Sequence, residues 1–185
     1  MSDFRFALTD EEKTYLKDLV VQSISVGLKL SEGPTEPPEP PTETLRESLG
    51  AFVTLKLGGE LRGCIGNVQG TEELYQTIWN MARHAAFKDP RFPPLHKNEF
   101  DAVEYEISIL SPLETCPDTK LVEVGRHGLI MSRGAQSGLL LPQVPVEWNW
   151  DRETFLAQTC VKAGLPRDAW KDPETTILWF EAVVF

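Results

Sequence analysis

The segment LRGCIG at residues 61–66 holds the residue best suited to covalent chemistry, Cys64, between Gly63 and Gly66. A cysteine that acts as a nucleophile needs a nearby cation that stabilises its thiolate, and Arg62 lies two residues away. Glycines in a strand leave bare backbone that a ligand or another segment can approach closely. We therefore take Cys64 as a candidate catalytic residue. The alternative is a small buried cysteine, since free cysteine is among the most buried residue types.

A second group of candidates lies in residues 83–97, RHAAFKDPRFPPLHK, where four Lys and Arg residues accompany a single acid, Asp89. A basic island in an acidic chain predicts a site for an anionic group, with His84 and Arg91 as binding residues. The alternative is a solvated helix end in which Asp89 pairs locally with Arg91. His127, in GRHGLI, is a further binding candidate, although a lone histidine in such a loop is as often structural.

The sequence gives no sign of a metal or another cofactor. Its three histidines have no metal-binding spacing, and GxGxxG, P-loop and GxSxG motifs are absent. The three cysteines, Cys64, Cys116 and Cys160, form no CxxC pair. An odd number of widely spaced cysteines suits reduced thiols better than a disulfide framework. We therefore expect no cofactor and a cytoplasmic protein.

The composition indicates one folded domain over residues 1–185. Hydrophobic residues make up 41% of the chain, and five Trp and nine Phe can supply a core. A formal net charge of −10 argues against general affinity for nucleic acids or anionic membranes. No apolar run approaches the roughly 18 residues of a membrane-spanning helix, and the N-terminus shows no apolar signal core. We expect no membrane association.

Several elements must position Cys64, and the first is a helix over about residues 9–30. Thr9 and Glu12 have the spacing of a capping box at its start. Residues 31–44 follow, with five prolines and four glutamates. Such a segment is expected to be extended, acidic and on the surface, because proline cannot donate to a sheet. We expect the fold to tolerate its replacement by a flexible linker.

The candidate cysteine itself lies in a predicted hairpin, because two β-rich runs flank the glycine pair at 58–59. A two-residue turn pairs Leu57 with Glu60. In that register Arg62 and Cys64 share a face with Val53 and Leu55.

The remaining pattern predicts an α+β fold with a mainly antiparallel sheet flanked by helices. Thr71 is the predicted cap of a second helix, which the prolines of residues 88–95 end. Alternation over residues 101–110 predicts a strand with one buried face. A hairpin, a helix and a final strand are expected, in that order, over residues 127–144, 151–165 and 175–185.

Five segments carry a resemblance to a known family: FVTLKLGGELRGCIGNVQG, AAFKDPRFPPL, EYEISILSPLE, GRHGLIM and, near the C-terminus, GLLLPQV with FLAQTCVKAGL. From about residue 45 to residue 185 the chain resembles the AMMECR-type domain, also called AmmeMemoRadiSam system protein A. The resemblance implies two unequal lobes and a cleft into which the hallmark LRGCIG projects. The site residues carried over are Leu61, Arg62, Gly63, Cys64, Ile65 and Gly66.

The resemblance implies partners, a Memo-type protein and a radical SAM protein, rather than a cofactor, and it names no reaction. One hypothesis is an adaptor or substrate-presenting module whose cleft recognises a peptide, a nucleic-acid element or a modified group for its partner enzymes. A small anionic ligand is a further candidate partner. The alternative is an enzyme that uses Cys64 as nucleophile or acid/base group on a small anionic or nucleic-acid-related substrate, which Arg62 and either His84 or Arg91 orient. We favour the adaptor, because no histidine has a spacing that guarantees contact with Cys64. In either case we expect Arg62 to be at least partly exposed.

Overall fold

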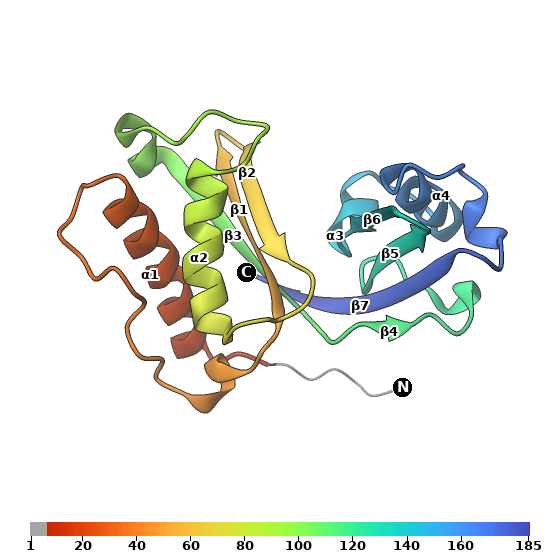
Figure 1. The fold of residues 1–185 in the computed structure, drawn as a ribbon, viewed down its shortest axis with the longest axis horizontal. Helices are drawn as coiled ribbons and strands as arrows, with labels where there is room; N and C mark the ends of the chain where they lie inside the picture. Colours follow the sequence, from red (N-terminus) through yellow and green to blue (C-terminus); the bar gives the residue numbers. More distant parts are fainter. Residues whose placement is uncertain (1–6) are drawn as a thin grey trace. The chain divides into compact units, whose positions relative to one another are not determined.

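A computed structural model describes residues 7–185 and is drawn in Figure 1. The chain divides into two compact units, one of which holds the described residues up to Leu110 together with Val183–Phe185. The other unit is Ser111–Ala182. Helices accompany antiparallel strands in both units, so the predicted α+β fold with a mainly antiparallel sheet is confirmed. The cleft that the resemblance implies stays a prediction.

In the first unit the strands lie in the order β2 (Glu60–Asn67), β1 (Gly50–Leu57) and β3 (Val103–Leu110), all antiparallel. The helix α2 (Leu74–Phe87) packs on β1 and β2, and α1 (Asp10–Gly27) packs on α2 (Figure 1). Apolar residues of both helices and of β1 and β3 form one core. In the described part of the chain β2 is an edge strand, so Cys64 has a neighbouring strand on one side.

The two helices begin differently from each other. At α1 the predicted capping box is present, because Thr9 Oγ1 accepts from the Glu12 N–H and the Glu12 carboxylate accepts from the Thr9 N–H. The predicted Thr71 cap of α2 is wrong, because the helix starts only at Leu74, without a side-chain cap. Its first N–H binds the Glu47 carbonyl instead, at 3.0 Å. As predicted, α2 ends just before the proline-rich residues 88–95.

The hairpin has the predicted turn and a different register beyond it. Leu57 pairs with Glu60 as expected, but the register shifts so that Leu55 pairs with Gly63. Arg62 is therefore the extra residue of a β-bulge. A one-residue shift moves every later side chain to the opposite face. The predicted grouping of Cys64 with Val53 and Leu55 is thus wrong, and Cys64 lies opposite Thr54.

Residues 31–44 lie mostly exposed and form no strand, and the short 3₁₀-helix Glu43–Arg46 overlaps their end. Side-chain hydrogen bonds attach the segment to α1, one of them between the Ser25 and Ser31 hydroxyls at 2.9 Å. The Tyr15 hydroxyl donates to the Pro38 carbonyl at 2.6 Å, and the Thr42 hydroxyl donates to the Glu12 carboxylate. Replacement of this segment by a flexible linker would therefore remove specific contacts as well as surface chain.

The second unit has the strand order β6, β5, β7, β4. These strands are β6 (Gln136–Leu140), β5 (His127–Arg133), β7 (Thr176–Val184) and β4 (Glu114–Thr115). The last two residues of β7 belong to the first unit. Its helices are α3 (Gln143–Glu147) and α4 (Arg152–Lys162), which Asp151 caps through the Thr154 N–H. The predicted hairpin, helix and final strand are confirmed.

No helix within residues 7–185 is both long enough and apolar enough to cross a membrane.

Candidate functional site

The backbone of Cys64 is bonded on the open side of the sheet. Its N–H donates to Oδ2 of Asp89 at 2.8 Å, and its carbonyl accepts from Nη2 of Arg91 at 3.1 Å. An edge strand ordinarily leaves such groups without a strand partner. Asp89 and Arg91, from the loop that follows α2, thus take the place of a neighbouring strand at this one residue.

Asp89 and Arg91 are also an ion pair, with 2.7 Å between Oδ2 and Nη2 and 2.9 Å between Oδ1 and Nε. The Asp89 side chain is only 1% exposed, whereas that of Arg91 is 51% exposed. Hydrogen bonds, first from Arg91 and then from the Cys64 N–H, hold the pKa of Asp89 well below its usual range despite burial. The local pairing considered for these residues is present, but Asp89 is buried rather than solvated, and the pair also binds the strand.

Arg62 fixes the same loop further along. Its Nε donates to Oε1 of Glu99 at 2.8 Å and its Nη1 donates to the Pro93 carbonyl at 2.9 Å. Its Nη2 donates to Oε2 of Glu99 and, at 3.4 Å, to the Pro94 carbonyl. Arg62 lowers the pKa of Glu99 to about 2. The Arg62 side chain keeps only 11% exposure, so this arginine clamps a loop and has little surface for a ligand.

The glycines beside Cys64 are explained by close packing. A Cβ at Gly63 would lie 2.2 Å from the carbonyl oxygen of Ala85 in α2. A Cβ at Gly66 would lie 2.4 Å from the ring of Phe52 and still closer to the Ala51 carbonyl oxygen. Real Cβ atoms do not approach other atoms so closely, so both positions require glycine. The glycines therefore make room for other parts of the same unit, namely α2 beside Gly63 and β1 beside Gly66.

The Cys64 side chain is half-buried, and its sulfur accepts a hydrogen bond of 3.2 Å from the Thr54 hydroxyl. Within residues 7–185 no other hydrogen bond reaches this sulfur. Ile65, on the opposite face, packs against the core, and Leu61 is 43% exposed. The six neighbouring hallmark residues therefore have different roles: some pack inside the unit, Arg62 holds the loop, and Leu61 lies on the surface.

The two candidate histidines lie in different units. His84 is half-buried on α2 with Nε2 3.3 Å from Nζ of Lys88, and burial with this neighbouring cation lowers its pKa. His127 is 3% exposed, and its Nδ1 accepts from the Glu123 N–H at 3.0 Å. Its ring stacks on Trp179 with 4.5 Å between centroids, and burial lowers its pKa. These contacts give His127 a structural role at the start of β5.

Three residues that organise this region were not predicted as site residues, although the pairing of Asp89 with Arg91 was considered. Glu99 holds Arg62, Thr54 contacts the Cys64 sulfur, and Asp89 binds the Cys64 backbone. For Asp89 the sequence offered a partial signal, a lone acid in a basic segment, because a buried carboxylate requires a partner. For Glu99 and Thr54 nothing in the local pattern marks them out.

Within the part of the chain that is described, no group of three or more His, Cys, Asp or Glu side chains has an arrangement that could hold a metal ion.

Comparisons with known proteins agree with the resemblance seen in the sequence. The AMMECR1 family model matches residues 18–185. A protein of Thermococcus gammatolerans is 48% identical over 160 residues, which span 81% of this chain and 78% of that protein. Protein PH0010 of Pyrococcus horikoshii is 42% identical over 190 residues, 97% of this chain and 92% of that protein. The crystal structure of PH0010, titled an uncharacterized protein, matches with a TM-score of 0.88 at 41% identity, over 96% of this chain and 92% of that chain. The chain belongs to the AMMECR1 family.

Proposed function

We propose that this protein is a non-catalytic adaptor or substrate-presenting module, and that residues 88–97 together with the hallmark strand β2 are its binding surface. The observation that carries the proposal is the direction of the polar contacts. Arg62, Asp89 and Arg91 bond strand and loop to each other, and none of them donates to the Cys64 sulfur. An arrangement of this kind fixes a surface, whereas a catalytic site directs its polar groups toward the reacting atom.

Rigidity is the first property that suits this loop for binding. At one end of the loop the Asp89 carboxylate binds the Cys64 N–H of β2. Just beyond its other end, Glu99 binds the Arg62 guanidinium, which also belongs to β2. Between them, prolines fix backbone angles, and Pro93 and Pro94 are exposed. A loop that is ordered before binding loses less conformational entropy when a partner arrives.

Charge is the second property. Lys88, Arg91, His96 and Lys97 are exposed, whereas the one acid among them, Asp89, is buried. This surface suits an acidic segment of a partner protein, because complementary charge raises the association rate and excludes wrong partners. A Memo-type protein and a radical SAM protein are the partners that we propose. A small anionic group or a nucleic-acid element is a less favoured occupant, since the whole chain carries a net charge of −10.

One observation favours the alternative function, an enzyme with Cys64 as nucleophile or acid/base group. The Thr54 hydroxyl donates to the Cys64 sulfur, and a donor at this position would stabilise a thiolate. The exposed Arg91 guanidinium beside the strand could hold an anionic substrate. The site lacks a hydrogen-bonded base for the thiol among the described residues, so it is incomplete as a nucleophile–base pair.

Calorimetric titration of this protein with purified Memo-type and radical SAM proteins from the same organism tests the proposal. We expect saturable binding that weakens about tenfold in Lys88→Glu and Lys97→Glu. Lys162→Glu, an exposed lysine on α4, is the matched control and should bind as the native protein does. Cys64→Ser should also bind normally. Absence of binding to both partners, or equal binding by the two loop variants and the control, would refute the adaptor. A cytoplasmic location is part of the same proposal.

A further inference from the structure

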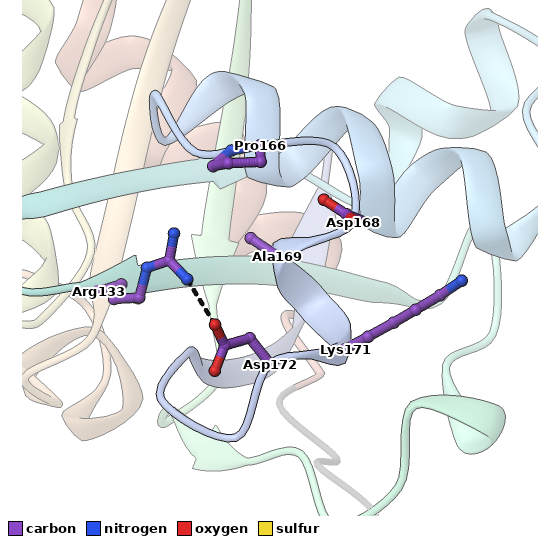
Figure 2. Close-up of a pocket in the computed structure, with 6 residues that line it drawn as sticks. All are labelled: Arg133, Pro166, Asp168, Ala169, Lys171 and Asp172. Carbon is purple, nitrogen blue, oxygen red and sulfur yellow. Dashed lines mark hydrogen bonds and ion pairs between the residues drawn. The ribbon is translucent and has the colours of Figure 1, made fainter.

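A polar cavity lies entirely within the second unit. Its volume is about 360 Å³, which is within the range of small-molecule sites. It is drawn in Figure 2, and it is lined by Arg133, Pro166, Asp168, Ala169, Lys171 and Asp172. The lining thus combines two cations and two anions with two small apolar residues.

Arg133, the last residue of β5, is held at one terminal nitrogen and free at the other. Its Nη1 donates to Oδ2 of Asp172 at 2.8 Å, and Oδ1 of Asp172 accepts from the Glu174 N–H at 2.9 Å. Asp172 is therefore fixed by its own neighbour and orients the guanidinium. Figure 2 shows the second terminal nitrogen of Arg133 pointing away from Asp172. Among the described residues this nitrogen has no hydrogen-bond acceptor.

Asp168 supplies the opposite charge. It is exposed and precedes the 3₁₀-helix Ala169–Lys171, but its side chain makes no capping hydrogen bond there. In Figure 2 Asp168 and Arg133 lie on either side of Ala169, and the Lys171 side chain extends away from Arg133. The Lys171 ammonium lies over the Trp170 ring, 4.9 Å from its centroid. A free donor and an uncommitted carboxylate therefore face the same cavity.

We propose that this cavity binds a small aminocarboxylate, with the carboxylate on Arg133 and the ammonium group on Asp168. A guanidinium presents N–H donors in a plane that matches a carboxylate. A simple anion would bind Arg133 but be repelled by the negative charge of Asp168. A simple cation would bind Asp168 but be repelled by Arg133. A zwitterion satisfies both groups, and its methylene carbons would lie against Pro166 and Ala169. This inference does not depend on the adaptor function.

The test is an NMR titration of the ¹⁵N-labelled full chain with glycine, 4-aminobutyrate and 6-aminohexanoate, which differ in the distance between their charges. Acetate and methylammonium are the controls with a single charge. We expect saturable shifts at Arg133 and around residues 166–172 with at least one aminocarboxylate, and weaker, non-saturating shifts with both controls. Absence of saturable shifts with all three probes at up to about 10 mM would overturn the proposal, because binding would then be weaker than any useful affinity.

Two variants link the shifts to the named groups. Asp168→Asn should weaken aminocarboxylate binding at least about tenfold. Arg133→Gln should do the same, while Arg167→Gln, an exposed arginine outside the lining, should leave the affinity unchanged. Arg133→Gln also removes an ion pair and could unfold the unit. The Asp168 side chain makes no hydrogen bond with the described residues, so Asp168→Asn decides the case alone. Unchanged affinity in Asp168→Asn would refute the proposed binding mode.

Discussion

Arg62 and Arg133 show two uses of the same side chain. Arg62 has a protein acceptor at each of its three guanidinium nitrogens, and its side chain is 11% exposed. Among residues 7–185 Arg133 has one acceptor, Asp172, and its side chain is 29% exposed. A guanidinium with every nitrogen bonded positions backbone, whereas one with a free nitrogen can receive a ligand. The LRGCIG strand, which has the most distinctive sequence, therefore holds the more fully bonded arginine, and the cavity of the second unit holds the less fully bonded one.

The largest expected effect is that of Gly63→Val, which tests whether the hallmark strand is closed. The new side chain would collide with the Ala85 carbonyl of α2, so we expect a loss of about 3 kcal/mol in the free energy of unfolding. Urea unfolding measures this, with Glu60→Val, exposed on the same strand, as the control. Equal stability of the two variants would mean that space beside Gly63 is open to a ligand.

A smaller loss, about 2 kcal/mol, is expected for Asp89→Ala. This change leaves the Cys64 N–H without its acceptor and Arg91 without its carboxylate partner. The cost stays below that of a fully buried pair because Arg91 is half exposed and can be hydrated. Asp101→Ala, an exposed acid in the same unit, is the control and should change the free energy of unfolding by less than about 0.5 kcal/mol. A loss no larger than that of the control would contradict the role given to Asp89.

The Arg62 clamp predicts a dependence of stability on pH. The pKa of Glu99 falls from 4.5 in the unfolded chain to about 2 in the folded protein. Because the folded value is lower, its contribution is complete above pH 4.5 and is lost as the pH falls from 4.5 towards 2. We expect Glu99→Gln to be less stable than the native protein at neutral pH and to lose less stability over that acid range. If the native protein and Glu99→Gln lost the same stability between pH 4.5 and 2, the clamp would contribute little.

Much of the fold can be predicted from local pattern. The capping box of Thr9 and Glu12, the glycine turn at residues 58–59 and the proline stop after α2 each depend on residues close in sequence. The bulge at Arg62 could not be predicted in this way. A bulge depends on how the two strands pair and leaves no mark in the residue pattern, yet it moves Cys64 to the other face.

The candidate site was harder to predict because its contacts span the chain. Asp89 binds a residue 25 positions away and Glu99 binds one 37 positions away. The sequence identified Cys64, Arg62 and Arg91 as neighbours of interest, but their roles depend on which acceptors the fold brings to them. Gly63 was predicted to admit a close neighbour, and only the structure identifies that neighbour as α2.

The central claim is that the contacts around Cys64 position a loop and do not activate its sulfur. Mass-spectrometric measurement of alkylation, cysteine by cysteine and at neutral pH, tests it in native and urea-unfolded protein. We expect Cys64 to react more slowly in the native protein than in the unfolded chain. Cys160, which is buried and whose thiol pKa burial raises, should be the slowest of the three in the native protein. Faster alkylation of Cys64 in the native protein than in the unfolded chain would contradict the account and favour a catalytic thiol.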